Sequence, residues 1–325
     1  MCASIAMARQ RRRLELLLKV ATRYWVDGAS QADIARELGY SRPQISRLLQ
    51  EARERGVVRI SVQHPLSRAV EAEEQLVSRF NLAGAHVAFA DDADPQSTAP
   101  VLSLGAELLL SMLKPDSVVA VTNGRAVAGV VAALPTSRHH EVTVVQAIGA
   151  IARDNHMVDS PDLCRRLAAV LGGNYRILPA PLYVNDSHAA SALRRESTIS
   201  LTISMASHAD IILTGIGATT RAGAGAIFDL WYGSAEIAEL LRMGAVGHIG
   251  GHHFNASGQH TDGNLCRRLL GVPFDRIRDS SDVIAVAWGE EKVPAILGAL
   301  RGGLVSHLVT DMRTANAVLA LDDAA

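Results

Sequence analysis

The chain has 325 residues and a formal net charge of −1, with 32 Lys and Arg against 33 Asp and Glu. This length predicts about two domains, and the 48% apolar and 20% charged content argues against a disordered chain. The most apolar long run, residues 117–134, contains Asn123 and Arg125, which argues against a membrane span. The arginine-rich N-terminus lacks the apolar run of a signal peptide. Three cysteines without a C-x-x-C pair exclude a disulfide scaffold and a cysteine-based zinc site, and we expect a cytoplasmic protein.

The near-neutral total conceals an unequal distribution of charge. Residues 1–60 hold 12 basic and 6 acidic residues, a net charge of +6. The remaining residues hold 20 basic and 27 acidic residues, a net charge of −7. A basic N-terminal part on an acidic body predicts two domains with different binding partners.

Residues 31–49 predict two short helices joined by a turn. Apolar residues recur at helical spacing on both sides of Gly39, and glycine suits the positive φ of a tight turn. Ser30 precedes the first helix, and Ser41 with Gln44 three residues later forms a capping box at the second. Two helices joined in this way form a helix-turn-helix.

The polar face of the second helix is predicted to enter the major groove of DNA, where Arg binds guanine and Gln binds adenine. The residues expected to contact DNA are Gln31, Ser41, Arg42, Gln44, Ser46, Arg47 and Gln50. A preceding helix is predicted to cover the pair with Leu14, Leu17, Leu18, Ala21 and Trp25. Residues 57–62 have the pattern of a strand, which would make the domain a winged helix-turn-helix. The alternative is a solvated helix pair in an accessory domain of an enzyme.

From about residue 85, short runs rich in Val and Ile alternate with helical segments. Runs that are apolar throughout predict strands buried on both faces, as in a mostly parallel sheet flanked by helices. The predicted strands are residues 85–90, 117–122, 142–148, 209–214, 283–287 and 304–310. The body is therefore predicted to be a doubly wound α/β domain.

These patterns predict three parts: a winged helix-turn-helix over residues 1–62, a linker helix over 63–82 and the α/β domain over 83–325. The linker helix has an apolar stripe that faces either the body or a second subunit. The stripe consists of Val70, Leu76, Val77 and Phe80.

Ligands of doubly wound sheets bind beyond the carboxyl ends of the strands. The turn at residues 122–126 contains Gly124 and places backbone N–H groups at a helix N-terminus, which suits an anion. An ordinary strand–helix turn is an equal alternative. Gly215 and Gly217 follow another predicted strand and either permit close approach of a ligand or form a plain turn.

Residues 244–255 combine several glycines with His248, His252 and His253, and His260 follows. The glycines argue against a helix that would hold these histidines, with Asp262, in the fixed geometry that a metal needs. We expect solvated loop histidines or a single sugar-binding histidine, and no metal site.

Lys292, after the predicted strand at 283–287, is one of only three lysines in the chain. A lysine in the first turn of a helix opposes the helix dipole. Either an anionic ligand or the neighbouring Glu290 and Glu291 would offset that cost.

In this order along the chain, the motifs resemble those of the SorC family of bacterial sugar-responsive transcriptional regulators. The N-terminal part matches through Gln31-Ala32-Asp33-Ile34-Ala35, Ser46-Arg47-Leu48-Leu49 and residues 52–58. The body matches through Asn123-Gly124-Arg125 and residues 146–149, 178–181, 209–211, 215–217, 244–247, 287–292, 300–303 and 308–311.

The resemblance implies a homo-oligomer, either a dimer or a tetramer, that binds double-stranded operator DNA. It implies a body that is similar to sugar-phosphate isomerases and binds a sugar, sugar phosphate or polyol effector without a cofactor. The effector contacts that it implies are Thr122, Asn123, Gly124, Arg125, Ala126, Gly149, Gly215, Gly217, His248, Asn255 and Lys292.

Two departures from the family pattern concern the effector. Ala126 stands where the family tends to have Thr or Ser, and His248 and Asn255 stand where it often has acids. These changes predict an unusual effector, such as an unphosphorylated polyol or a sugar acid. The competing function is a phosphosugar isomerase or deaminase with an accessory DNA-binding domain. Because such enzymes need positioned carboxylates, only Asp229 and Glu236 remain as candidate acids.

Overall fold

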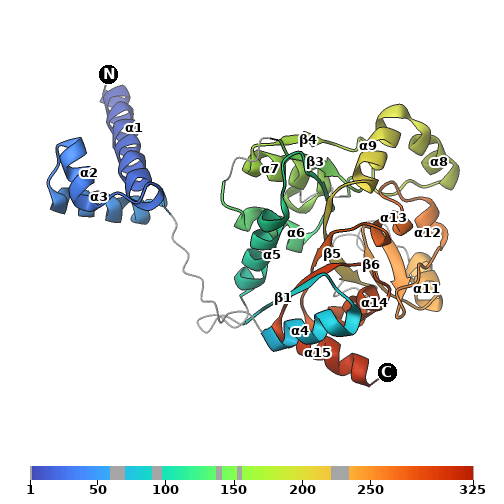
Figure 1. The fold of residues 1–325 in the computed structure, drawn as a ribbon. Helices are drawn as coiled ribbons and strands as arrows, with labels where there is room; N and C mark the ends of the chain where they lie inside the picture. Colours follow the sequence, from blue (N-terminus) through green and yellow to red (C-terminus); the bar gives the residue numbers. More distant parts are fainter. Residues whose placement is uncertain are drawn as a thin grey trace. The chain divides into compact units, whose positions relative to one another are not determined.

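The computed structural model of the chain describes residues 2–58, 70–89, 97–136, 141–151, 156–220 and 234–324. The chain divides into two compact units, Met1–Pro65 and Leu66–Ala325 (Figure 1). Each unit has hydrophobic side chains buried in a core of its own. None of the described helices is long and apolar enough to cross a lipid bilayer.

The smaller unit is helical throughout its described residues. Its elements are α1 (Cys2–Ala21), the π-helical turn η1 (Thr22–Val26), α2 (Gln31–Leu38) and α3 (Arg42–Glu54). Leu17, Val20 and Ala21 of α1 are buried against the other two helices. The expected roles of Leu14 and Leu18 in covering the pair are wrong, since these side chains are 41% and 58% exposed. Residues at i, i+3 and i+4 share one helix face. In α1, Leu17, Val20 and Ala21 have this spacing and form the buried face.

Local side-chain bonds define the turn between α2 and α3 as the sequence predicts. Ser30 caps α2 by accepting a hydrogen bond from the Asp33 N–H at 3.2 Å. Ser41 and Gln44 form the capping box of α3, and Gly39 has a φ of 70°. The helix-turn-helix is therefore present. The predicted wing cannot be placed, because its residues 59–62 lie outside the described residues.

The larger unit is built on a sheet whose strands follow the order β1-β9-β8-β5-β2-β3-β4, with β6 beside β5 and β7 beside β6. The strands are β1 (Gly84–Ala88), β2 (Val118–Val121), β3 (Thr143–Gln146), β4 (Asn174–Arg176), β5 (Ile211–Ala218), β6 (Ala245–Ile249), β7 (His252–Asn255), β8 (Val283–Val286) and β9 (His307–Asp311). All neighbours are parallel except in the antiparallel group β5, β6 and β7. The six predicted strands are all present, whereas β4, β6 and β7 were not predicted.

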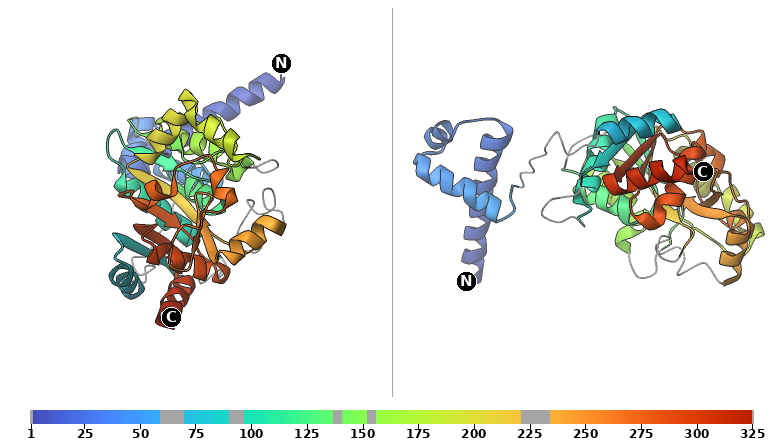
Figure 2. Two further views of the ribbon diagram at one scale, coloured as in Figure 1. Left: turned by 90° about the vertical axis from the view of Figure 1, so that its right-hand side faces the viewer. Right: turned by 90° about the horizontal axis from the view of Figure 1, so that it is seen from below.

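Helices cover both faces of this sheet (Figures 1 and 2). Those of the larger unit are α4 (Val70–Phe80), α5 (Ala99–Met112), α6 (Arg125–Ala133), α7 (Ser160–Leu171), α8 (Ser187–Arg195), α9 (Ser197–Ser207), α11 (Ser234–Arg242), α12 (Asn264–Arg267), α13 (Phe274–Arg278), α14 (Val293–Arg301) and α15 (Met312–Asp323). Helices α5, α6 and α7 pack on one face, and α4, α9, α14 and α15 pack on the other. This is the doubly wound α/β architecture that the apolar strands predict.

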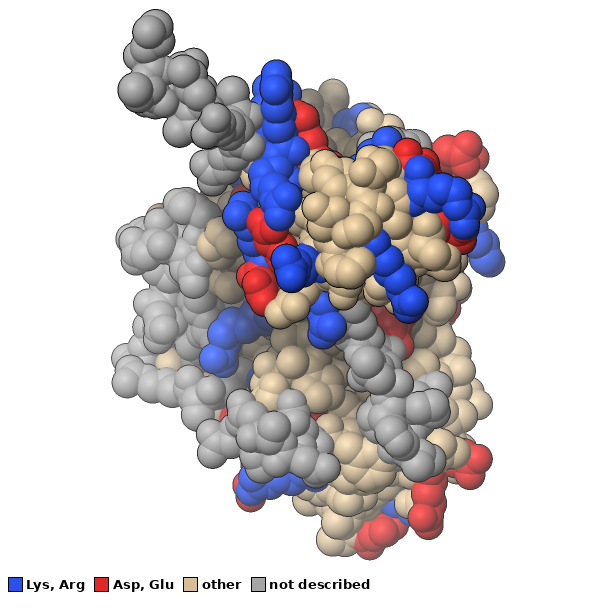
Figure 3. All heavy atoms as spheres, turned by 90° about the vertical axis from the view of Figure 1, so that its left-hand side faces the viewer, with Lys and Arg blue, Asp and Glu red and all other residues tan. Residues whose placement is uncertain are grey.

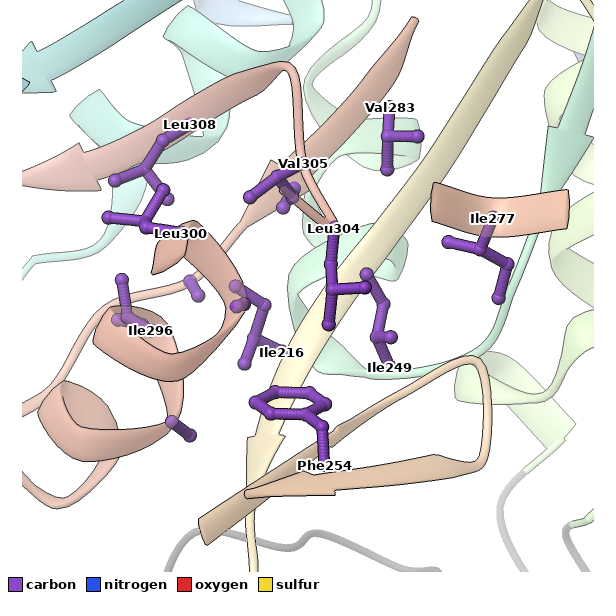
Figure 4. Close-up of a cluster of buried hydrophobic side chains, with 14 of the residues drawn as sticks. Ile216, Ile249, Phe254, Ile277, Val283, Ile296, Leu300, Leu304, Val305 and Leu308 are labelled. Carbon is purple, nitrogen blue, oxygen red and sulfur yellow. The ribbon is translucent and has the colours of Figure 1, made fainter. Parts of the chain in front are cut away.

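Successive residues of the central strands enter opposite cores because side chains alternate along a strand. Val119 of β2 belongs to the core under α5, α6 and α7, while Ala120 belongs to the core on the other face. Figure 4 shows part of this second core, where Ile216 of β5 lies beside Phe254 of β7, and Ile296 of α14 belongs to the same core. The β6–β7 hairpin is therefore an integral part of the larger unit.

Helix α4, predicted as part of a linker, packs on β1 and α15 of the larger unit. Leu76 is fully buried there, and Val77 and Phe80 pack against the same core. Val70 does not take part in this packing, since its side chain is 57% exposed.

Candidate functional site

The exposed face of α3 carries arginines that have no acidic partner among the described residues. Arg42 and Arg47 are both exposed and form no ion pair or hydrogen bond within the described part of the chain. Several other arginines of this unit do have acidic partners; Arg13 and Arg55, for example, both pair with Glu51. Figure 3 shows Lys and Arg side chains spread over one face of the smaller unit, several beside an Asp or Glu. Unpaired guanidinium groups on the second helix are the groups free to contact DNA.

Most of the remaining residues predicted to contact DNA have partners within the unit or a partly buried position. The Gln44 side-chain oxygen accepts a hydrogen bond from the Ser41 N–H at 2.8 Å, so only its amide NH₂ remains to be donated. Gln50 donates to Glu54 at 2.9 Å. Ser46 is exposed, and Gln31 is partly buried at the start of α2.

The second candidate site lies where the strand order of the larger unit reverses. From β2 the chain proceeds outward through β3 and β4, and it then returns to place β5 on the other side of β2. Doubly wound folds bind ligands beyond the carboxyl ends of the strands at such a reversal. The turns after β2 and β8, at residues 122–126 and 288–292, lie at these strand ends.

The turn after β2 leads directly into α6. Gly124 is the N-cap of α6, with a φ of 118° and no side chain to cap the helix. The first N–H groups of a helix have no partner within the helix. Thr122 donates its hydroxyl to Thr214 of β5 at 3.1 Å. The Ala126 methyl lies 3.9 Å from a Cβ built on Gly215, which brings the first turn of α6 over β5.

Lys292 lies in the turn after β8, at the same edge of the sheet. It is the N-cap of α14, and its ammonium lies 5.8 Å from the centre of the Trp288 ring. Burial lowers the pKa of Lys292, repulsion by Arg125 lowers it further, and Glu291 acts in the opposite direction. Two cations from separate strand ends are therefore close enough to repel one another, and Arg125 lies in the first turn of α6, an arrangement that an anion stabilises.

The glycines of β5 and the histidines of the β6–β7 hairpin have structural environments that differ from those predicted. Gly215 and Gly217 lie within β5 and not in a turn after it, because the strand continues to Ala218. A Cβ on Gly217 would lie 2.0 Å from the His248 ring, so this glycine makes room for the neighbouring strand. Solvated loop histidines are likewise a wrong expectation: His248, His252 and His253 are at most 7% exposed.

Two other residues predicted to contact the effector form hydrogen bonds within the protein. The Asn255 side-chain oxygen accepts hydrogen bonds from the N–H groups of Ser257 and Gln259, both at 3.0 Å. Gly149 donates its N–H to the Leu270 carbonyl at 2.9 Å. Of the two candidate acids for an enzyme, Glu236 pairs with Arg268 at 3.5 Å, and Asp229 lies outside the described residues.

We expect Gly149→Ala to destabilise the larger unit strongly. A Cβ at this position would lie 2.3 Å from the Pro181 carbonyl, a backbone contact that cannot rotate away. Overpacking of this kind costs about 1–3 kcal/mol or more, which thermal unfolding will measure. Gly215→Ala is the matched control, because the nearest atom to its added Cβ is 3.7 Å away. Equal melting temperatures for the two variants would contradict this account of Gly149.

Two features of the larger unit were not predicted from the sequence. The first is the Trp288 ring, which lies beneath the Lys292 ammonium. A tryptophan four residues before a lysine is only a weak sequence signal for such a contact. One ligand atom each of His252, His260 and Cys266 lie within 4.8 Å of one another. Cysteine spacing had excluded a cysteine-based zinc site, but it gave no information on histidines that the fold brings to Cys266.

Comparison with known proteins assigns both units. Residues 64–320 match a family of sugar-binding domains, and residues 7–59 match a family of homeodomain-like domains. The transcriptional regulator LsrR of Klebsiella pneumoniae is 34% identical, with 98% of this chain and 96% of the relative covered. The deoxyribonucleoside regulator of Bacillus subtilis is 31% identical, with 95% and 98% covered. The crystal structure of the full-length sorbitol operon regulator SorC from Klebsiella pneumoniae has a TM-score of 0.78 at 29% identity, with 94% and 98% covered.

Proposed function

Since the chain belongs to the SorC family of sugar-binding transcriptional regulators, we propose that α3 binds operator DNA and that an effector bound between Arg125 and Lys292 controls this binding. The family membership confirms the resemblance drawn from the motifs. Relatives that are transcriptional regulators also favour this function over a phosphosugar isomerase or deaminase. We extend this to propose that the protein binds its effector without turning it over.

The observation that carries the effector site is the convergence of two cations at the strand-order reversal. Arg125 and Lys292 come from turns after β2 and β8, and Gly124 leaves the first N–H groups of α6 open. A carboxylate or phosphate of a sugar satisfies both cations and the helix N-terminus together. Hydroxyl groups of the same molecule can bind the polar groups nearby, of which Asn123 is partly exposed.

We propose that the protein acts in the cytoplasm as a homo-oligomer, either a dimer or a tetramer, on a roughly two-fold symmetric operator. A symmetric oligomer presents two copies of α3 to half-sites related by the same symmetry. Effector binding then shifts the equilibrium between arrangements of the oligomer in which the two copies of α3 match the half-site spacing and arrangements in which they do not. The coupling free energy between effector binding and DNA binding is about 1–3 kcal/mol.

The test is a thermal-shift panel of sugars, polyols, sugar acids and sugar phosphates with the full chain. Each compound that raises the melting temperature is then added to a gel shift with a duplex selected by the protein from a random library. We expect at least one anionic sugar both to stabilise the protein and to change its DNA affinity. Turnover of a stabilising sugar by the purified protein would instead support the enzyme.

The affinity for the selected duplex is expected to fall steeply with salt concentration. Arginine contacts to phosphates release counterions, and the logarithm of the binding constant falls by about 0.9 per phosphate contact for each tenfold rise in salt. Fluorescence anisotropy at several salt concentrations measures this slope. A flat dependence would contradict docking of α3 in the groove.

A further inference from the structure

A second polar cluster lies in the larger unit, at the start of β7. It consists of His252 of β7, His260 in the following loop and Cys266 of α12. His252 and Cys266 are 6% and 7% exposed, and His260 is partly buried. The cluster shares no residue with the turns that hold Arg125 and Lys292, so the proposed effector site does not account for it.

The distance between the two histidine nitrogens matches that of a tetrahedral metal site, and the sulfur lies close to the required position. Zn–N bonds of about 2.0–2.1 Å place two nitrogen ligands about 3.3 Å apart at the tetrahedral angle. The His252 Nδ1 and His260 Nε2 atoms are 3.3 Å apart. With a Zn–S bond of about 2.3 Å, the sulfur lies about 3.6 Å from each nitrogen. The Cys266 sulfur is already within 4.8 Å of both histidine ligand atoms, so a shift of about 1 Å completes the geometry.

Surrounding groups hold the three side chains in position. The His252 Nε2–H donates to the Val272 carbonyl at 2.9 Å, which leaves the Nδ1 lone pair directed at the cluster. Metal-bound histidines almost always donate their second nitrogen to a carbonyl or carboxylate in this way. The His260 ring stacks on Phe274 with centroids 4.3 Å apart and planes 9° apart. Cys266 lies close to the Thr261 carbonyl, to which its thiol donates at 3.4 Å.

From this geometry we propose that His252, His260 and Cys266 form a binding site for a thiophilic transition-metal ion such as Zn²⁺. Two imidazole nitrogens and one thiolate are ligands that Zn²⁺ prefers over Mg²⁺ or Ca²⁺. The fourth position is open to water. On binding, the thiol loses its proton to solvent. His260, whose Nε2–H donates to His252 Nδ1 in the metal-free protein, changes to the tautomer with its proton on Nδ1 and binds the metal through Nε2.

The site ties β7 to α12 across the loop at residues 256–263. The loop already returns to β7, since the Thr261 N–H donates to the His253 carbonyl at 2.9 Å. A metal that binds only the folded unit stabilises it by mass action. We therefore expect Zn²⁺ to raise the melting temperature of the full chain.

The experiment uses the full chain without an affinity tag, stripped of metal by a chelator. Equilibrium dialysis against Zn²⁺ followed by metal analysis is expected to give one ion per chain, together with a rise in melting temperature. Cys266→Ser and His260→Gln are each expected to lose both effects. Co²⁺ is a second probe, because a thiolate ligand gives a charge-transfer absorption band that Cys266→Ser abolishes.

Cys164→Ser is the matched control, because Cys164 is the other buried cysteine of this unit and lies in α7, outside the cluster. This variant is expected to bind Zn²⁺ as the unaltered chain does. Circular dichroism establishes that each variant is folded, and if Cys266→Ser is not, the partly exposed His260→Gln decides. The site is overturned if the unaltered chain retains no Zn²⁺, or if Cys266→Ser and His260→Gln retain as much Zn²⁺ as the unaltered chain.

Discussion

Replacing Arg42 and Arg47 together by alanine is expected to abolish specific DNA binding while the protein remains folded. Each arginine that binds a guanine bidentately contributes about 1–3 kcal/mol of discrimination, or roughly 5- to 150-fold in affinity. Neither side chain has a hydrogen-bond or ion-pair partner among the described residues, so their removal breaks no such interaction in that part of the chain. Anisotropy titration with the selected duplex measures the affinity, and thermal unfolding measures the stability.

Arg23→Ala with Arg36→Ala is the matched control, since it removes the same charge from the same unit. Arg23 pairs with Glu37 at 3.1 Å and Arg36 pairs with Asp33 at 3.2 Å, so both are neutralised locally. This variant is expected to bind the duplex several-fold more weakly at most. An equal loss in both double variants would mean that overall charge, and not the face of α3, determines recognition.

The helix-turn-helix was predictable because the signals that form it are local. Ser41 and Gln44 lie three residues apart and bond to each other's backbone N–H groups, independently of the rest of the chain. Gly39 takes a positive φ at the turn where the sequence requires one. The preceding helix was placed less accurately, because which of its leucines is buried depends on the face that contacts α3. That face includes Leu17 and excludes Leu18.

The sheet was predictable where its strands are apolar on both faces. Strand β4 escaped prediction because the three residues of 174–176 include no aliphatic side chain and are exposed or partly exposed. The β6–β7 hairpin escaped because its glycines and histidines resemble a loop in sequence, although Ile249 and Phe254 beside them are buried. The His248 ring packs against the Cα of Gly217, where a side chain would clash with it. These two residues are 31 positions apart, so no local sequence pattern reveals the contact.

The positions of the residues of the proposed effector site were predictable in part, because some of them follow recognisable strands. The turn at residues 122–126 and Lys292 lie at ends of strands that are recognisable in sequence, and the strand order brings the two ends together. Asn255 was assigned from the family pattern alone, whereas its amide is used by a turn of the hairpin. A binding residue at the end of one recognisable strand can be predicted from sequence. A binding residue whose position depends on how the two strands of a hairpin pair can be identified only from the three-dimensional structure.

Lys292→Met is expected to remove the effector response and to raise the stability of the effector-free protein. A charge-assisted hydrogen bond contributes about 1.5–3 kcal/mol, so effector affinity falls by roughly 10- to 150-fold. The stabilisation arises because burial and Arg125 both disfavour the charged lysine, lowering its pKa below the usual 10.5. Isothermal titration with an identified effector measures the affinity, and Lys114→Met, at an exposed lysine, is the control.

The pH dependence follows from the direction of that pKa shift. Between the lowered pKa of folded Lys292 and 10.5, the unfolded chain binds more of the Lys292 proton than the folded chain does, so in this pH range the residue makes stability rise with pH. Lys292→Met is therefore expected to gain most stability near neutral pH and to lose that advantage as the pH approaches 10.5. A bound anionic effector stabilises the charged lysine and reduces this rise in the unaltered chain. A variant less stable than the unaltered chain at neutral pH would show that the Trp288 contact outweighs the cost of the buried charge, and that the lysine is held for packing and not for an anion.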